Sequence, residues 1–231
     1  MVKHKKIVII GVAAIIILAL LSIWAIRSRG SSMFHELGYL YGESVKAPAK
    51  EKSTYAIAAK DFSISEAEFQ NLAAQNIAIG YDKDAAEQLA YCQLILQRAL
   101  YYQAIQEGVS ATEEEVNAQI ETDRAVMPTA GNADDYLEYI EGTGMTEDEY
   151  WDSMRETYQR TMTLAKYAEQ KRAEFLTAEN DPTDTESWDA YCLELTRQAV
   201  AAQDIVLSDP GAWELTSENY NRAGIWPKTA S

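Results

Sequence analysis

Apolar residues recur at helical spacing through the middle of the chain, over residues 85–120. Positions three or four apart form one apolar stripe, and a second stripe lies beside it. Gly108 stands where a left-handed C-cap would end a helix, because glycine adopts that conformation without a Cβ clash. Thr112 and Glu115 then form a capping-box pair. The pattern predicts a long buried helix that stops near Gly108 and a second helix immediately after it.

The same signals predict further elements on both sides of this helix pair. We expect a short helix through residues 136–140 and a last strand over 204–207 that pairs with the first strand, so that both find hydrogen-bond partners. The fold class is mainly α with a minimal two-stranded β element. The other expected elements are a strand over 55–58 that turns at Lys60-Asp61, a helix from Ser65, a long helix from Thr146 to about Thr177, and a helix over 186–203 that folds back onto the earlier helices.

The N-terminal region is typical of a membrane anchor. Residues 7–26 are apolar and uncharged, about the length that a helix needs to cross a bilayer, and lack a good cleavage site. We expect an uncleaved single-pass anchor over residues 1–29, with the N-terminus cytoplasmic and the remainder extracytoplasmic. Residues 30–53, with several glycines, are interpreted as a tether that could reach several nanometres. Its apolar residues could instead prolong the membrane helix or lie at the membrane interface; they are Met33, Phe34, Leu37, Tyr39, Leu40 and Tyr41. The folded domain is predicted over 54–207, and a loosely packed tail over 208–231.

The order of these motifs resembles the extracytoplasmic chaperones typified by SurA and PrsA, over residues 55–170. The resemblance is to their N-terminal helical domain. It rests on the strand, turn and Ser-x-x-Glu-Phe start at 65–69, on Leu94-Ile95-Leu96 through Gly108-Val109 to the Thr-x-x-Glu at 112–115, and on the Thr-x-x-Glu at 146–149. In place of the family's usual Asn-Gly, the turn has Lys60-Asp61. The resemblance implies a chaperone that binds exported chains.

Many members of that family carry a parvulin-type prolyl isomerase domain, which this chain does not have room for. The residues after 170 are too few, and none of them is histidine. The prolyl isomerase activity of the family is therefore not expected here.

The charge of the chain is strongly acidic outside the anchor. The net charge is −16, and residues 30–231 hold 15 basic against 36 acidic residues, a net −21. Such a surface repels nucleic acid and anionic lipid headgroups, so no nucleic acid partner is expected. The acidity is explained by the solubility of an exported domain; a cationic client or a calcium site is the alternative.

The two cysteines, Cys92 and Cys192, lie on predicted helix faces among apolar residues. Two separate core thiols are favoured, and a disulfide outside the cytoplasm is the alternative.

The sequence offers no catalytic constellation. His4 and His35 are the only histidines, which leaves no base for a Ser-His-Asp arrangement. Acidic runs at 113–115 and 147–149 fall at helix starts, where carboxylates favour the helix dipole, so they are not interpreted as metal ligands. We expect no enzyme activity, no cofactor and no metal.

The remaining candidate chemistry is adaptable binding of other polypeptides. Methionine repacks around varied shapes, and tyrosine presents a flat apolar body with a polar tip. Most of these side chains could instead form the core. The predicted function is a membrane-anchored chaperone-like protein that binds unfolded or exported polypeptides; the alternative is a dedicated interaction subunit of an envelope complex. The candidate peptide-binding residues are Tyr101, Tyr102, Met127, Tyr136, Tyr139, Met145, Tyr150, Trp151, Met154, Tyr158 and Met162.

Overall fold

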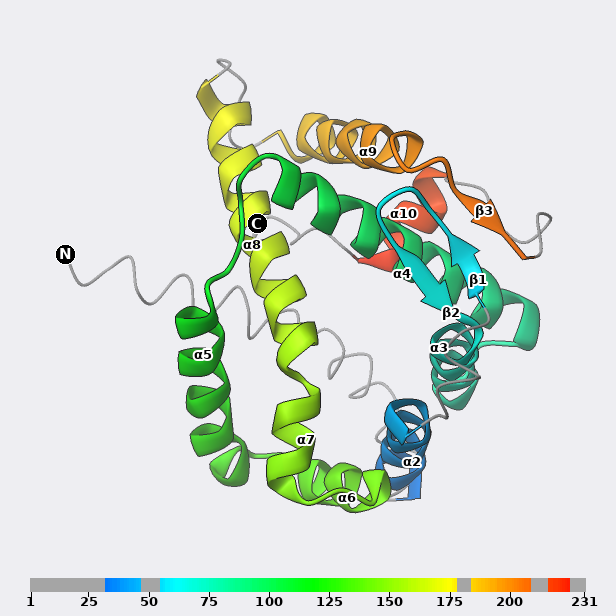
Figure 1. Cartoon of the computed structure of the whole chain (residues 1–231), viewed down its shortest axis with the longest axis vertical. Coiled ribbons are helices and arrows are strands. Elements are labelled where there is room, and N and C mark those ends of the chain that lie inside the picture. The colour runs from blue at the N-terminus through cyan, green and yellow to red at the C-terminus, as the bar shows by residue number, and fades with distance from the viewer. Residues whose placement is uncertain (1–31, 47–54, 178–183, 209–215, 225–231) are drawn as a thin grey trace.

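The computed structural model describes residues 32–46, 55–177, 184–208 and 216–224, and these residues are mainly helical, as predicted (Figure 1). A small antiparallel sheet lies at one side. The elements in chain order are α2 (Ser32–Lys46), β1 (Tyr55–Ala58), β2 (Ser63–Ser65), α3 (Glu66–Ala78), α4 (Lys83–Gln106), α5 (Glu113–Val126), the 3₁₀ helix η2 (Met127–Thr129), α6 (Ala133–Thr143), α7 (Glu147–Ser153), α8 (Arg155–Thr177), α9 (Thr185–Ala201), β3 (Val206–Leu207) and α10 (Ser217–Ala223).

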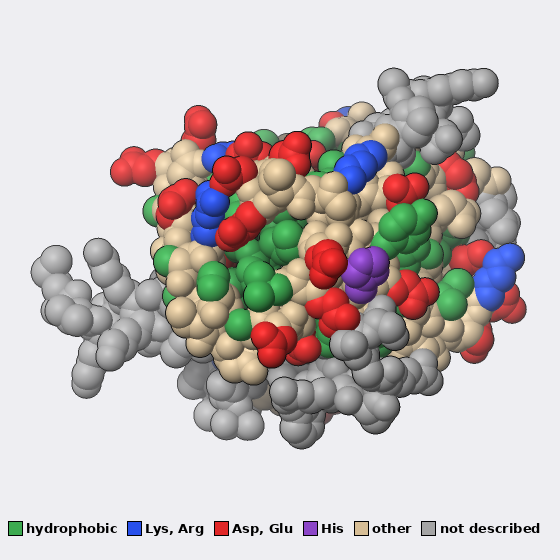
Figure 2. Space-filling model, turned by 90° about the horizontal axis from the view of Figure 1, so that it is seen from below, with side chains coloured by type: hydrophobic (Ala, Val, Ile, Leu, Met, Phe, Trp, Pro, Cys, Tyr) green, Lys and Arg blue, Asp and Glu red, His purple; other side chains and the backbone are tan. Residues whose placement is uncertain are grey.

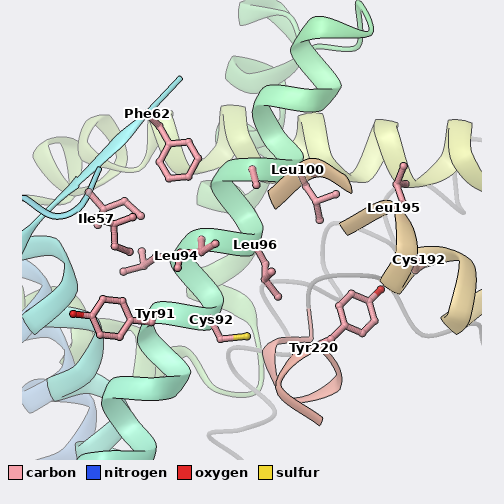
Figure 3. Close-up of a cluster of buried hydrophobic side chains, with 14 of the residues drawn as sticks. Ile57, Phe62, Tyr91, Cys92, Leu94, Leu96, Leu100, Cys192, Leu195 and Tyr220 are labelled. Carbon is pink, nitrogen blue, oxygen red and sulfur yellow. The ribbon is translucent and has the colours of Figure 1, made fainter. Parts of the chain in front are cut away.

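Helix α4 is the long buried helix that the sequence predicts, and it lies at the centre of the fold. The side chain of Asp82 caps its start by accepting a hydrogen bond from the Ala85 amide at 2.9 Å. Gly108 follows its end with φ +79°, as expected for a glycine C-cap. Helices α3, α8, α9 and α10 all pack on α4, which explains its wide apolar surface (Figure 3). Its buried residues are Ala86, Leu89, Ala90, Tyr91, Cys92, Leu94, Ile95, Leu96, Ala99, Leu100 and Ala104.

The sheet has the strand order β2-β1-β3, with both pairs antiparallel. The expected pairing of the last strand with the first is confirmed, with Ile57 opposite Leu207. The expectation of only two strands was wrong, because residues 63–65 return beside β1 and pair with it. The Ala59 amide donates to the Phe62 carbonyl at 2.9 Å and closes the turn between these two strands.

The predicted helix starts are confirmed by their caps. Thr112 and Glu115 exchange hydrogen bonds of 3.2 and 2.7 Å at the start of α5, and Thr146 and Glu149 do so at the start of α7. Ser65 caps α3.

The long helix expected from Thr146 to Thr177 divides at Met154 into α7 and α8. The Ser153 hydroxyl donates to the Tyr150 carbonyl at 2.6 Å, one turn back. Such a bond competes with the backbone hydrogen bonds of the helix.

Residues 32–46, expected within a tether, form helix α2, so this expectation was wrong. Helix α2 packs closely on α6 and also contacts α3. Its Met33, Phe34 and Leu37 side chains are buried. The segment therefore belongs to the folded body of the protein.

Glycines make the contact between α2 and α6 possible. A Cβ added at Gly38 would lie 2.0 Å from the Tyr139 carbonyl oxygen, and one at Gly42 would lie 2.2 Å from that of Thr143. From the other side, a Cβ at Gly142 would lie 2.1 Å from the His35 carbonyl oxygen. The two backbones thus touch, which explains glycines that the sequence alone suggested were linker residues.

Residues 216–224, expected within a loosely packed tail, also belong to the body. They include helix α10, which packs on α4 and buries Tyr220. Cys92 and Cys192 are both buried and form no disulfide, as the favoured interpretation of two core thiols predicts.

The described core divides into two hydrophobic clusters. The first joins the sheet, α3, α4, α9, α10 and the C-terminal half of α8 (Figure 3). The second joins α5, α6, α7 and the N-terminal half of α8. The predicted anchor at residues 7–26 lies outside the described residues, and no helix among those described is long and apolar enough to cross a membrane.

Candidate polypeptide-binding site

Nine of the eleven candidate peptide-binding residues gather in the second hydrophobic cluster. Capping and helical periodicity bring them together, because the glycine turn after α6 and the capping box of α7 fold these helices onto the start of α8. Four of the nine are buried, namely Tyr136, Tyr150, Trp151 and Tyr158, and five are partly buried, namely Met127, Tyr139, Met145, Met154 and Met162.

Tyr150 is the centre of the aromatic packing. Its ring lies 5.3 Å from that of Trp151 and 6.0 Å from that of Tyr139, both in edge-to-face geometry. Tyr136 approaches it edge-on at 6.5 Å. Tyr41 of α2 approaches it at 6.1 Å. Edge-to-face rings place positive edges against negative faces, which stabilises the cluster beyond the burial of its apolar surface.

Carboxylates hold the polar ends of these aromatic residues. The Tyr158 hydroxyl donates to Asp123 at 2.7 Å. Glu147 accepts longer bonds from the Tyr136 hydroxyl, at 3.3 Å, and from the Trp151 indole, at 3.4 Å. Burial, together with the charge of Glu147, raises the pKa of Tyr136 to about 12. The tyrosines therefore stay neutral hydrogen-bond donors at physiological pH.

The other two candidates, Tyr101 and Tyr102, lie apart from this cluster. Both are on α4, where Tyr102 stacks on Phe62 at 5.8 Å and packs against the first hydrophobic cluster. Tyr101 meets the Tyr102 ring edge-on at 5.3 Å. The structure therefore does not bring these two together with the other nine.

Sequence reasoning missed residues that complete the surface over the second cluster. Tyr41 was hidden in the expected tether, although it contacts Tyr139 and Tyr150 and shares a 2.9 Å hydrogen bond with Ser153. Val126 and Leu137 were assigned to helices but remain 55% and 56% exposed. An apolar residue on the polar face of an amphipathic helix is the signal that could have identified Leu137.

The face on which α2, α6 and the lower end of α5 lie carries a patch of hydrophobic side chains (Figure 2). Acidic side chains surround it, and a few basic ones lie at separate places on the same face. Helix α6 supplies some of this acidity, since Asp134 and Glu141 are exposed on it. Arg124 of α5 pairs with Asp148 and lies 3.7 Å from Glu147.

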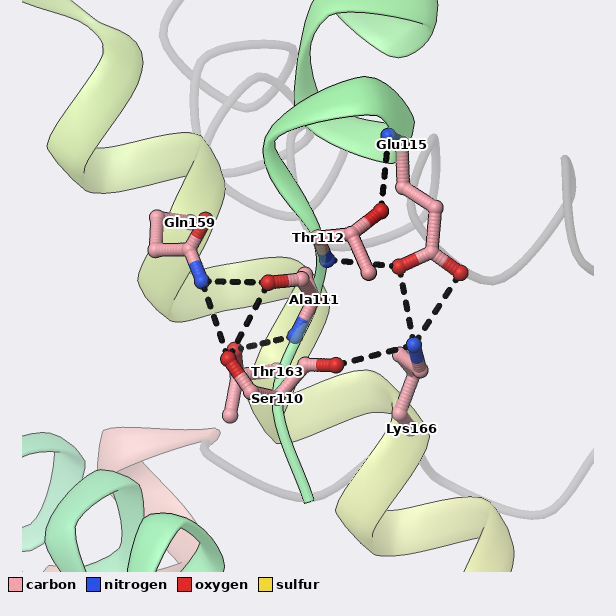
Figure 4. Close-up of polar contacts among 7 residues, drawn as sticks. All are labelled: Ser110, Ala111, Thr112, Glu115, Gln159, Thr163 and Lys166. Atoms are coloured by element: carbon pink, nitrogen blue, oxygen red, sulfur yellow. Dashed lines mark hydrogen bonds and ion pairs between the residues drawn. The ribbon is translucent and has the colours of Figure 1, made fainter. Parts of the chain in front are cut away.

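A polar network fixes α5 against α8 and so holds one wall of the cluster (Figure 4). The buried Thr163 hydroxyl accepts a hydrogen bond from the Ala111 amide at 3.0 Å, and Gln159 donates to the Ala111 carbonyl at 2.6 Å. Lys166 binds Glu115 at 2.8 Å. The network satisfies the backbone just before α5, where the chain would otherwise have unpaired polar groups.

No group of three or more His, Cys, Asp or Glu side chains is placed to hold a metal ion within the described residues.

Comparison with known proteins adds no relative: no family model, no curated protein and no solved structure matches this chain. The resemblance to SurA and PrsA therefore stays a prediction from sequence motifs.

Proposed function

We propose that this chain is a chaperone-like protein that binds unfolded or exported polypeptides without catalysis, and that residues 7–26 anchor it in a membrane. The observation that supports it best is the exposed apolar patch built over the aromatic cluster. Val126, at the end of α5, and Leu137 of α6 are exposed, and the neighbouring second cluster includes partly buried methionines and Tyr139. Exposed apolar patches with polar borders mark sites of protein interaction.

The composition of this surface suits varied partners. Methionine side chains adjust to different shapes, and such surfaces bind many sequences with little specificity. The carboxylates that border the patch favour clients with basic residues beside their apolar segments. The order of helices and capping boxes is also the order that the resemblance to the SurA and PrsA helical domain implies.

The test is suppression of client aggregation by the full chain held in lipid nanodiscs. Light scattering of a chemically unfolded model client is followed with increasing amounts of the protein. We expect scattering to fall as the protein approaches and exceeds the client concentration. Unchanged scattering at a tenfold excess would contradict the proposal.

A matched pair of substitutions tests the role of the patch. Leu137→Glu places a charge in the patch, whereas Leu176→Glu places one at the far end of α8, and both leucines are exposed. We expect Leu137→Glu to weaken suppression severalfold and Leu176→Glu to leave it unchanged, with folding of both checked by circular dichroism. Equal behaviour of the two variants would place client binding elsewhere.

A further inference from the structure

Helix α10 has one buried side chain, Tyr220, and its partly buried Ala223 packs against the same hydrophobic cluster. Tyr220 is 6% exposed, whereas Ser217, Glu218, Asn221 and Arg222 of the same helix are exposed. A helix of seven residues is not stable by itself in water. Its order therefore depends on its packing against the body, in which Tyr220 is the buried anchor.

Tyr220 occupies a groove between α4 and α9 that is lined by apolar side chains. Cys92 of α4 lies on one side of its ring, and its hydroxyl is directed toward Cys192 of α9 (Figure 3). The Cys92 thiol also donates to the Asn219 carbonyl at 3.2 Å, which ties the α10 backbone to α4. We name this the α10 groove; Leu96, Leu195 and Ala199 belong to the same buried cluster.

The arrangement has the form of a peptide bound in a helical groove. A short helix that inserts an aromatic anchor between two longer helices is a common mode of peptide recognition. Here the peptide is part of the same chain, and a tethered ligand is present at an effective concentration in the millimolar range. Within the described residues, Tyr220, the partly buried Ala223 and the bond from Cys92 to Asn219 join α10 to the body, and local release of so short a helix costs less than unfolding of the whole domain.

We propose that α10 is a displaceable occupant of the α10 groove, and that the groove binds short helical segments of other polypeptides that carry an aromatic residue at the position of Tyr220. The inference rests on the proposed function, since it names a second binding site for the same class of clients. The patch over the second cluster would be open at all times, whereas the α10 groove opens only when α10 leaves.

The two thiols provide a direct measurement of groove occupancy. The chain has two cysteines in all, both of them border the groove, and both are buried. Their rate of reaction with a maleimide therefore reports how often the groove is open. We expect slow reaction in the full chain and at least tenfold faster reaction after Tyr220→Ala, while Tyr220→Phe, which keeps the ring, stays slow.

A synthetic peptide of residues 216–224 completes the test. At up to about 1 mM, close to the effective concentration of the tethered helix, it should slow the reaction of the Tyr220→Ala protein at least fivefold. The same peptide with alanine in place of Tyr220 should not protect. Lack of protection by the first peptide, or equal protection by both, would overturn the proposal.

Should Tyr220→Ala fail to fold, the unmodified chain decides the question. Reaction through local release of α10 depends only weakly on urea at low urea concentration, whereas reaction through global unfolding follows the full urea dependence of stability. A thiol reaction rate that follows the full urea dependence of global unfolding from zero urea upward would overturn the proposal.

These outcomes are separable from those of the aggregation test. Thiol protection without suppression of aggregation would leave the groove in place and remove the chaperone function. Suppression without thiol protection would remove the groove alone.

Discussion

Three glycines set the distance between α2 and α6. At Gly38, Gly42 and Gly142 an added Cβ would fall about 2 Å from a carbonyl oxygen of the facing helix. Backbone atoms cannot move aside as a flexible side chain can, so the helices would have to separate. Separation would loosen Met33, Phe34 and Leu37, which α2 buries.

Gly42→Ala should therefore destabilise the protein by about 1–3 kcal/mol, the usual cost of overpacking a core. The loss is expected although alanine is the better helix former. Urea unfolding followed by circular dichroism measures it. Gly131→Ala is the matched control, because Gly131 is exposed and a Cβ there meets nothing within 4 Å; its effect should stay within about 0.5 kcal/mol. Equal effects of the two substitutions would contradict the close packing.

Residue-scale prediction from the sequence succeeded where the cause is local. Thr112 with Glu115 and Thr146 with Glu149 lie three residues apart, so a short stretch of sequence is enough to predict each capping box. Gly38 and Gly42 led to the wrong prediction of a tether, because they are needed for packing against α6, which lies about a hundred residues later in the chain. Nothing close to them in the chain indicates that partner.

At the element scale, Glu107 joins the end of α4 to α8. Its carboxylate accepts a hydrogen bond from the Tyr167 hydroxyl at 2.6 Å and binds the Lys171 ammonium, also at 2.6 Å. Burial alone would raise the pKa of Glu107, but the hydrogen bonds from Lys171, Tyr167 and Gln103 outweigh it and lower the pKa below its ordinary value. The ionised form therefore stabilises the fold.

Glu107→Gln should cost about 1–3 kcal/mol at pH 7, since charge-assisted hydrogen bonds to a largely buried lysine are lost. The contribution of the carboxylate is fully present above its unfolded pKa and disappears as the pH falls through the lower folded pKa. Unfolding in urea at pH 7 and at decreasing acid pH should show the difference between the two proteins shrinking toward zero.

Glu174→Gln is the control for this prediction, because Glu174 also binds Lys171, at 2.9 Å, but from the same helix and with 47% exposure. Its effect should be well under 1 kcal/mol, as for other exposed pairs within a helix. A constant difference between Glu107→Gln and the unmodified protein at all pH values would show that the carboxylate charge is not the cause.

The same scale shows why some elements were predicted and others were not. The helices α4, α5 and α9 carry their own periodicity and caps, so the sequence was sufficient. Strand β2, which was not predicted, and helix α10 are too short to produce a periodic signal. Strand β2 is ordered by its pairing with β1, and α10 by the groove that receives Tyr220. The candidate site followed this division: its helices were predictable, but the contribution of Tyr41 from α2 was not.

At the scale of the whole molecule, the packing of α2 changes the expected relation of the domain to the membrane. Seven residue steps separate Ile26, at the end of the apolar run, from Met33, the first buried residue of α2. Even fully extended chain covers only about 25 Å in that number of steps. If residues 7–26 span a bilayer, the end of the body that carries α2 must lie close to its surface, in contrast to a tether of several nanometres.

Energy transfer to acceptor-labelled lipids in nanodiscs tests this arrangement. A fluorophore placed at the exposed position Tyr39 of α2 should transfer efficiently. One at Leu176, near the C-terminal end of α8, should transfer much less, because that end of α8 lies far from α2 (Figure 1). Insertion of a 20-residue Gly/Ser spacer after Arg29, with a mean span of about 25 Å, should reduce transfer from position 39 and bring the two values together. Equal transfer from both positions before the insertion would mean that α2 does not hold the domain near the membrane, and the apolar patch beside α2 would then not be confined to the bilayer surface.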